Sequence, residues 1–340
     1  MMIPEQMETK EMTRPMLAKS EKDDISISLR PPPWYLEGEG WWIILSILGP
    51  VRKRIVERIK QESRKKKTKP SADSTHSDSL GLLSPAPTPD FRGGFGSVQI
   101  IRYHSSAVGA YDELLLIPGV FKPPEESLNR TPVFRITQIY VSTLGSVLNG
   151  RHHWNIPKKL ARFEFTPVEG TTNKLNVKIY GLKSFRFTRS SGSTGWYFDP
   201  EFFDAPFFNM TIHRHLAPLN IPVDLGKLPI LDLTLLQPPL QTVDDDDHQP
   251  LEPDLLHLNP PIVDHSEWKR TKLAIKGRCG LCSFKGNLQP GNRKAPQFAD
   301  GEHFPDIKPY RIGFHFPRIS LTVLPASSIL ASSDPLSEKH

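Results

Sequence analysis

Cysteine is almost absent from this chain of 340 residues, which holds only Cys279 and Cys282. A structural zinc site takes four Cys or His ligands at short spacings, and no second pair accompanies this Cys-x-x-Cys motif. His303 and His315 lie downstream, but they do not form a closely spaced histidine pair. No βαβ pattern of the kind found around thioredoxin-like dithiols surrounds the motif. We therefore expect two ordinary thiols on or beside a strand, and no metal site.

Long hydrophobic runs are also missing. The most apolar stretch, Trp41 to Leu48, is far shorter than the roughly 20 residues with which a helix crosses a bilayer. Residues 1–24 mix both signs of charge and contain no apolar stretch of signal-peptide length. We expect a protein that does not enter a membrane, is not directed to the secretory route and lies in the cytoplasm.

Basic charge is concentrated in one segment instead of being spread over the chain. The formal net charge is +6, but residues 52–69 hold ten Lys or Arg against Glu57 and Glu62, so the rest of the chain carries about −2. A nucleic-acid-binding domain carries its basic residues on the folded surface among aromatic ones, so we expect no nucleic-acid partner. The segment itself is typical of a solvated helix or a disordered insertion. A localisation signal and a contact with an acidic membrane are the alternatives.

Proline, with 34 residues, is about twice as frequent as average, which argues against long helices. Short runs with period-2 alternation predict strands at 98–103, 133–142, 175–180, 185–187 and 311–324. A short helix is predicted over 142–148, ended by Asn149-Gly150, a dipeptide suited to a left-handed C-terminal turn. Together these patterns predict a mainly β (α+β) fold, a single antiparallel domain with few short helices and long loops.

Polar and Ser/Pro-rich segments delimit this domain. We expect a disordered N-terminal tail over 1–29, the folded domain over 30–325 and a C-terminal tail over 326–340. Inside the domain, residues 52–89 have the composition of a basic, Ser/Pro-rich insertion, and residues 236–254 that of an acidic, Pro-rich loop.

Two adjacent lysines stand in the sequence NGRHHWNIPKKLARFEF, residues 149–165. An exposed lysine, with a pKa of about 10.4, is almost fully protonated at pH 7 and is a poor nucleophile. Desolvation or a neighbouring cation favours the neutral, nucleophilic amine. Apolar neighbours that would desolvate these lysines are Trp154, Ile156, Pro157 and Leu160. Taken alone, however, PKKL is more typical of a solvated turn.

The stretch resembles the signature of the acetoacetate decarboxylase family, which runs Gly-Arg, two variable residues, an aromatic residue, two more residues, then Pro-Lys-Lys-Leu. The matching positions are Gly150, Arg151, Trp154, Pro157, Lys158, Lys159 and Leu160. In that family the first lysine forms a Schiff base and the second accompanies it. The resemblance therefore implies that Lys158 is the nucleophile and Lys159 a supporting cation. Because successive side chains of a strand point to opposite faces, Lys159 need not reach the pocket of Lys158.

A second block, VGAYDELLLIPGVF at 108–121, resembles the Gly-x-Tyr-x-Glu segment of the same family. It implies that Glu113 lines the active site and that Tyr111 contacts the substrate. Trp154 and Ile156 are further candidate substrate contacts. Arg151 would hold the substrate carboxylate or pair with Glu113, and a purely structural ion pair is the alternative.

The resemblance spans roughly residues 31–325, and its last block, DGEHFPDIKPYRIGF at 300–314, is similar to the closing strand region of fungal members. It implies a barrel-like or cone-like β domain and a homo-oligomer. The chain departs from the bacterial enzymes in the strand VQIIRY, where Gln99 and Ile101 occupy positions at which a further active-site acid is expected. This departure bears on the substrate more than on the lysine chemistry.

The implied reaction is loss of CO2 from a β-keto acid through an imine on Lys158, giving a methyl ketone with no metal or organic cofactor. The long insertions, and the loss of part of the polar set that a small substrate needs, favour a polyketide-derived acid from secondary metabolism. Two alternatives stay open. One is a lysine-dependent aldolase or dehydratase of the same fold, and the other is an inactive protein that binds an apolar carboxylic acid.

Overall fold

The computed structural model describes residues 28–45, 90–124, 131–189, 196–214, 221–227, 232–240, 267–289, 296–305 and 309–329. The predicted insertion at 52–89 lies outside these residues, as does most of the predicted segments 1–29, 236–254 and 326–340. The chain divides into two compact units, Ile27–Phe185 with Pro200–His340, and Met1–Ser26 with Arg186–Asp199. In the second unit the structure describes only the adjoining ends of two strands, so the fold below is that of the first.

The described residues are mostly strands, with one α-helix, so the predicted mainly β fold is confirmed. The helix is α2 (Leu144–Trp154), and a 3-10 turn covers Leu225–Lys227. The strands are β1 (Trp34–Leu45), β2 (Phe91–Gly93), β3 (Gly96–Ser105), β4 (Tyr111–Ile117), β5 (Val120–Phe121), β6 (Val133–Phe134), β7 (Gln138–Val141), β8 (Lys158–Pro167), β9 (Lys174–Arg189), β10 (Trp196–Phe202), β11 (Phe208–Arg214), β12 (Ile221–Asp224), β13 (Thr234–Gln237), β14 (Trp268–Gly286), β15 (Pro309–Val323) and β16 (Ser327–Ile329). No helix in the described part of the chain is long and apolar enough to cross a membrane.

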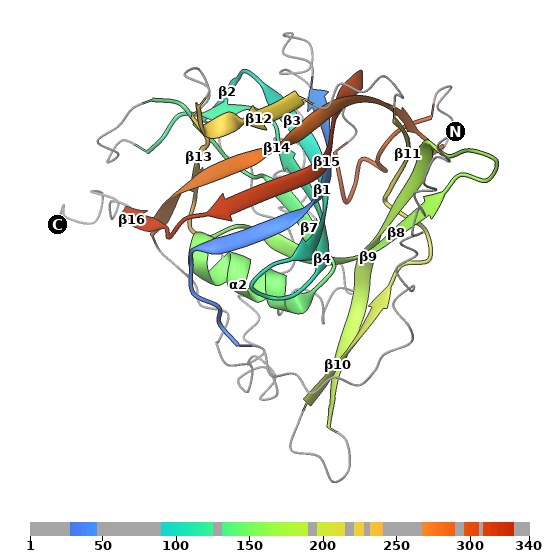
Figure 1. Cartoon of the computed structure of the whole chain (residues 1–340). Helices are drawn as coiled ribbons and strands as arrows, with labels where there is room; N and C mark the ends of the chain where they lie inside the picture. The colour runs from blue at the N-terminus through green and yellow to red at the C-terminus, as the bar shows by residue number, and fades with distance from the viewer. Residues whose placement is uncertain are drawn as a thin grey trace, which may run out of the picture. The chain divides into compact units, whose positions relative to one another are not determined.

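The strands form one large sheet that closes on itself (Figure 1). Its ladder runs β9-β8-β7-β4-β3-β1-β15-β14, and β11 pairs with both β14 and β9, which completes a ring. Most pairs are antiparallel, as predicted, but β7 and β8 are parallel, as are β6 and β13. A parallel pair needs a crossover connection. Helix α2 supplies the one between β7 and β8 and packs against both strands.

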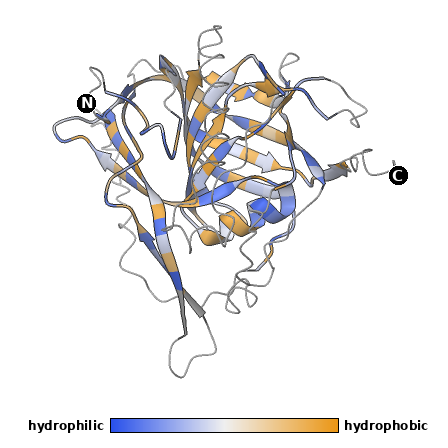
Figure 2. Ribbon diagram, turned by 180° about the vertical axis from the view of Figure 1, so that it is seen from behind, coloured by the Kyte–Doolittle hydropathy of each residue, from blue (hydrophilic) through white to orange (hydrophobic). Residues whose placement is uncertain are grey.

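Strands β3 and β4 are buried on both faces over most of their length, and apolar residues recur on each face. On one face Val98, Ile100, Leu114 and Leu116 join a hydrophobic cluster that also receives residues of β1, β9, β11 and β14. The alternate residues of both strands line a cavity on the other face. Figure 2 shows hydrophobic residues recurring along the strands of the sheet. On this face β3 and β4 supply most of the polar residues that line the cavity, namely Ser97, Gln99, Tyr103, Tyr111 and Glu113.

Helix α2 is longer than predicted and does not end at Asn149-Gly150. Thr143 caps its start by accepting a hydrogen bond from the backbone N–H of Ser146, and Asn155, with φ of 53°, ends it in the left-handed conformation. The side-chain amide of Asn149 donates to the carbonyl of Gly145 inside the helix, 3.0 Å away. The predicted end is wrong because Asn-Gly suits a left-handed turn but does not require one, and here tertiary contacts occupy both residues.

Candidate active site

The cavity has a volume of about 100 Å³, and on the same measure a single water molecule needs roughly 10–15 Å³. Its polar lining residues are Ser97, Gln99, Tyr103, Tyr111, Glu113 and Lys158. Its apolar lining residues are Trp34, Leu36, Trp42, Phe95, Ile101, Leu115, Ile117, Phe134, Ile136, Ile139, Trp154, Ile156, Leu233, Leu235, Leu273, Ile275, Ile319, Leu321 and Val323. A mostly apolar pocket with a few polar groups gathered together is typical of a small-molecule site.

Lys158 is brought into the cavity by the way the chain leaves α2. Asn155 turns the backbone at the helix end, Pro157 follows in the extended connection, and β8 begins at Lys158 itself. Only 5% of Lys158 is exposed. Its amine donates hydrogen bonds to Ser146 Oγ at 2.9 Å, Glu113 Oε2 at 3.1 Å and the Tyr111 hydroxyl at 3.4 Å. The predicted nucleophile is thus a buried amine held by three oxygen atoms.

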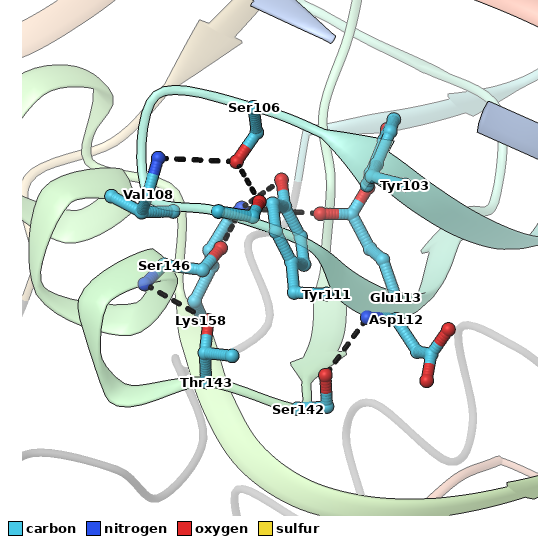
Figure 3. A network of polar contacts seen from close by, with 11 residues as sticks. Tyr103, Ser106, Val108, Tyr111, Asp112, Glu113, Ser142, Thr143, Ser146 and Lys158 are labelled. Carbon is cyan, nitrogen blue, oxygen red and sulfur yellow. Dashed lines mark hydrogen bonds and ion pairs between the residues drawn. The ribbon is translucent and has the colours of Figure 1, made fainter. Parts of the chain in front are cut away.

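Glu113 lies on β4 and is 4% exposed. One carboxylate oxygen pairs with Lys158, and the other accepts a hydrogen bond from the Tyr103 hydroxyl at 3.3 Å. Figure 3 shows these side chains converging, with the neighbouring Asp112 directed away. Asp112 instead pairs with Arg102 at 3.2 Å, as the alternation of side chains along a strand requires. A buried carboxylate next to a buried amine can exchange a proton with it directly.

The two tyrosines of the site stay protonated. Burial, and next the negative charge of Glu113, raise the pKa of Tyr103 and that of Tyr111 well above the ordinary value for a phenol. Their hydroxyl groups therefore act as neutral hydrogen-bond partners over the whole range in which the protein is expected to work. Tyr103 holds Glu113, and Tyr111 accepts from Lys158.

Ser146 and Gly150 show how α2 shapes the lysine's surroundings. Ser146 lies in the first turn of α2 and is fully buried, with its hydroxyl against the Lys158 amine. Gly150 lies one turn further on, where an added Cβ would stand 2.5 Å from Cδ of Lys158 and 2.8 Å from Cε. The absent side chain of Gly150 thus leaves the space through which the aliphatic part of Lys158 passes.

Five of the seven predicted site residues come together at the cavity, namely Lys158, Glu113, Tyr111, Trp154 and Ile156. Lys159 and Arg151 do not. Lys159 is paired with Tyr140 across the β7–β8 ladder, and its amine lies 5.3 Å from the centre of that ring. Tyr140 belongs to the hydrophobic cluster, so Lys159 points to the face opposite the cavity. Arg151 is buried on α2 but is not among the residues that line the cavity.

Tyr103 and Ser146 were not predicted as site residues. Tyr103 could have been found from the same alternation that places Gln99 and Ile101 on one face of β3, because it is the next residue of that face. For Ser146 the sequence held no signal, since its contact with Lys158 depends on how the helix packs against β8. Gln99 and Ile101 do face the cavity, in agreement with the position at which an acid was expected.

Among the described residues that line the cavity, Lys158 is the one cationic side chain. The described part of the chain also contains no group of three or more His, Cys, Asp or Glu residues placed to hold a metal ion. Cys279 and Cys282 are free thiols on β14, as predicted. The polar side chains that line the cavity offer an amine, a carboxylate, hydroxyl groups and an amide.

No protein-family model matches the sequence, and no curated protein matches it. One similar solved structure is an acetoacetate decarboxylase from Legionella pneumophila, with 13% identity and a TM-score of 0.45, covering 94% of this chain and 93% of that one. Another is an acetoacetate decarboxylase-like enzyme from Sphingomonas wittichii, with 10% identity and a TM-score of 0.45 over 88% and 94% of the two chains. A third is the enduracididine biosynthesis enzyme MppR, with 12% identity and a TM-score of 0.45 over 90% of both chains. Two of these three carry the name of the family that the sequence motif resembles.

Proposed function

We propose that this protein is a decarboxylase that removes CO2 from a β-keto acid with a long apolar chain, through a Schiff base on Lys158. The observation that carries the proposal is a buried lysine amine in a largely apolar cavity, 3.1 Å from a carboxylate that can take its proton. An amine becomes nucleophilic when desolvation disfavours its charged form or when an adjacent base takes its proton, and this cavity offers both.

The reaction begins with transfer of a proton from the Lys158 ammonium to Glu113. The neutral amine attacks the β-carbonyl carbon to give a carbinolamine. Glu113 then returns its proton to the hydroxyl group of this intermediate, so that water leaves and a protonated imine remains. The bond between the α-carbon and the carboxylate then breaks, its electron pair passes towards the imine nitrogen, and CO2 departs. The resulting enamine takes a proton from solvent water on the α-carbon, either directly or through Glu113. Hydrolysis of the imine releases a methyl ketone and restores the amine.

The hydroxyl groups around Lys158 keep this geometry. Tyr103 donates to Glu113 and fixes the carboxylate, while Ser146 and Tyr111 offer lone pairs to the amine. Side chains locked in this way hold the nucleophile within bonding reach of a substrate carbonyl, which is where positioning contributes most to rate.

The charge of the cavity favours decarboxylation over an aldolase or dehydratase reaction. An enzyme that retains the substrate carboxylate gains from a cation that holds it. In this cavity the described lining offers no cation besides Lys158, whose charge in the protonated imine lies at the reacting carbon, and Glu113 would repel a carboxylate that is retained. Loss of neutral CO2 removes the negative charge of the carboxylate from these surroundings, which therefore favour decarboxylation.

The length and apolarity of the cavity favour a long substrate chain. On β4 the lining residues run from Tyr111, beside the amine, to Ile117, a distance of about 20 Å at the usual rise of a strand. Acetoacetate would leave most of this wall uncovered, whereas an extended apolar chain would bury it. A β-keto acid released from polyketide synthesis in secondary metabolism has such a chain.

Borohydride trapping tests the proposal. The protein is incubated with β-oxododecanoate and sodium borohydride, and the expected result is one added ligand mass on the peptide that contains Lys158. Lys158→Ala and Lys158→Arg should both abolish the adduct, since a guanidinium does not lose its proton. Release of CO2 in the absence of borohydride separates a decarboxylase from an aldolase or dehydratase. If no adduct forms between pH 5 and pH 9, the protein binds its ligand without an imine and the proposal is wrong.

A further inference from the structure

A second polar group lies in the cavity, away from the lysine. Gln99 is 8% exposed and lines the cavity between apolar residues of β1, β3 and β4. Its side-chain amide donates one hydrogen bond to Ser97 Oγ, at 3.0 Å. In the described part of the chain the Gln99 side chain makes no other hydrogen bond. The proposed reaction at Lys158 does not use this amide.

The position of Gln99 relative to Lys158 follows from the strand register. Gln99 pairs with Leu115, Leu115 with Ile139, and Ile139 with Lys158, so the four residues form one row across β3, β4, β7 and β8. All four line the cavity. Three strand spacings separate the ends of the row, or about 14 Å along the wall. A ligand joined to Lys158 can therefore extend over Leu115 and Ile139 to reach Gln99.

The amide has more hydrogen-bonding capacity than Ser97 uses. A primary amide carries two N–H donors and an oxygen with two lone pairs, so one N–H and the oxygen remain for a ligand or water. A buried polar group without a partner is unfavourable by an amount comparable to a hydrogen bond. In a cavity built to hold only a hydrocarbon chain, an apolar residue at this position would be more favourable.

We propose that Gln99 is a specificity-determining residue that recognises an oxygen atom, as a keto or hydroxyl group, on the distal part of the substrate chain. The substrate class is then an oxygenated long-chain β-keto acid and not a simple fatty β-keto acid. The N–H that remains would donate to a keto oxygen, and the amide oxygen would accept from a hydroxyl group. This inference rests on the proposed function for the identity of the reacting group, but the recognition itself needs no imine.

The test measures binding by calorimetry with ligands that cannot form an imine. The parent ligand, 2-tridecanol, is compared with diols of the same chain length that carry a second hydroxyl group at successive distal carbons. We expect one or two adjacent positions to bind about five-fold to ten-fold tighter than the parent, the usual gain from a satisfied hydrogen bond. Equal affinity along the whole series would overturn the inference.

Gln99→Met removes the amide while keeping the length of the side chain, and it should make all members of the series bind alike. Ile101→Met, two residues along the same face of β3, is the matched control and should keep the preferred position. A preference that survives Gln99→Met would assign the recognition to another group and refute the role of Gln99. Because these ligands form no imine, a binding preference can be observed even if borohydride trapping fails. Trapping can likewise succeed when no preference is found, so the two proposals can fail separately.

Discussion

Replacing Gly150 by alanine is the most direct test of how α2 positions the side chain of Lys158. The added Cβ would lie 2.5 Å from Cδ, 2.8 Å from Cε and 3.2 Å from Cγ of Lys158. Carbon atoms in contact are separated by about 3.5–4.0 Å, so the lysine side chain must move by about 1 Å. The helix backbone suits alanine, because Gly150 lies inside α2 and is not among the glycines with positive φ.

A displacement of this size has different effects on activity and stability. The amine lies 2.9 Å from Ser146 Oγ and 3.1 Å from Glu113 Oε2, near the outer limit of strong hydrogen bonds. A shift of about 1 Å breaks at least one of these contacts, and misplacement of that order costs about 100-fold in rate, or about 2.7 kcal/mol. Stability should hold or rise, since alanine is favoured over glycine in a helix by up to about 1 kcal/mol and a lysine side chain moves easily.

The assay compares kcat/KM for β-oxododecanoate, the rate of borohydride trapping and the urea midpoint of the same preparation. Gly145→Ala is the matched control in the same helix, because its Cβ would meet Val108 at an ordinary 3.5 Å. We expect Gly150→Ala to lose about 100-fold in kcat/KM and Gly145→Ala to stay near the wild-type value. Wild-type activity in Gly150→Ala, or a loss of activity that follows a loss of stability, would refute the positioning role of Gly150.

Three other predictions follow from the described contacts. Lys159→Met should keep borohydride trapping within about threefold of wild type, because the Lys159 amine lies away from the cavity. The free energy of unfolding should fall by about 1 kcal/mol, because the contact of this amine with the Tyr140 ring is lost. Lost trapping in a folded variant would contradict this. Burial raises the pKa of Asp300, but hydrogen bonds from His303 and from backbone N–H groups outweigh this effect and lower the pKa below the ordinary value of 3.8. The Asp300 carboxylate therefore stabilises the folded protein above that pH, and this stabilisation is lost as the pH falls further. Urea unfolding should show a loss of stability below about pH 4 that is smaller in Asp300→Asn, and an unchanged slope would contradict the assignment. Burial also raises the pKa of both thiols, so iodoacetamide at pH 8 should modify Cys282 far more slowly in the native protein than in urea, as mass spectrometry would show; equal rates would show that the thiol is accessible.

The sequence by itself determined the class of fold and the identity of the central lysine. Alternating apolar residues predict most of β3, β9 and β15, because side chains of a strand must face two different environments. The high proline content argues against long helices. The Pro-Lys-Lys-Leu motif and the Tyr-x-Glu segment bring Lys158, Tyr111 and Glu113 to attention before any contact is known, and the structure places all three at one cavity.

Only the tertiary structure decided which groups surround that lysine. From the sequence, Lys159 need not share the pocket of Lys158. Which of the two lysines faces the cavity and which the hydrophobic cluster depends on their pairing with Ile139 and Tyr140. The helix end at Asn155 instead of Asn149-Gly150, and the close approach of Gly150 to Lys158, depend on how α2 packs against β8. Strands far apart in the sequence supply the apolar walls of the cavity, and a local pattern contains no information on which distant segments will meet. The physical reason is that the lysine's chemistry depends on desolvation and on oxygen atoms within about 3 Å, and both are properties of packing between segments.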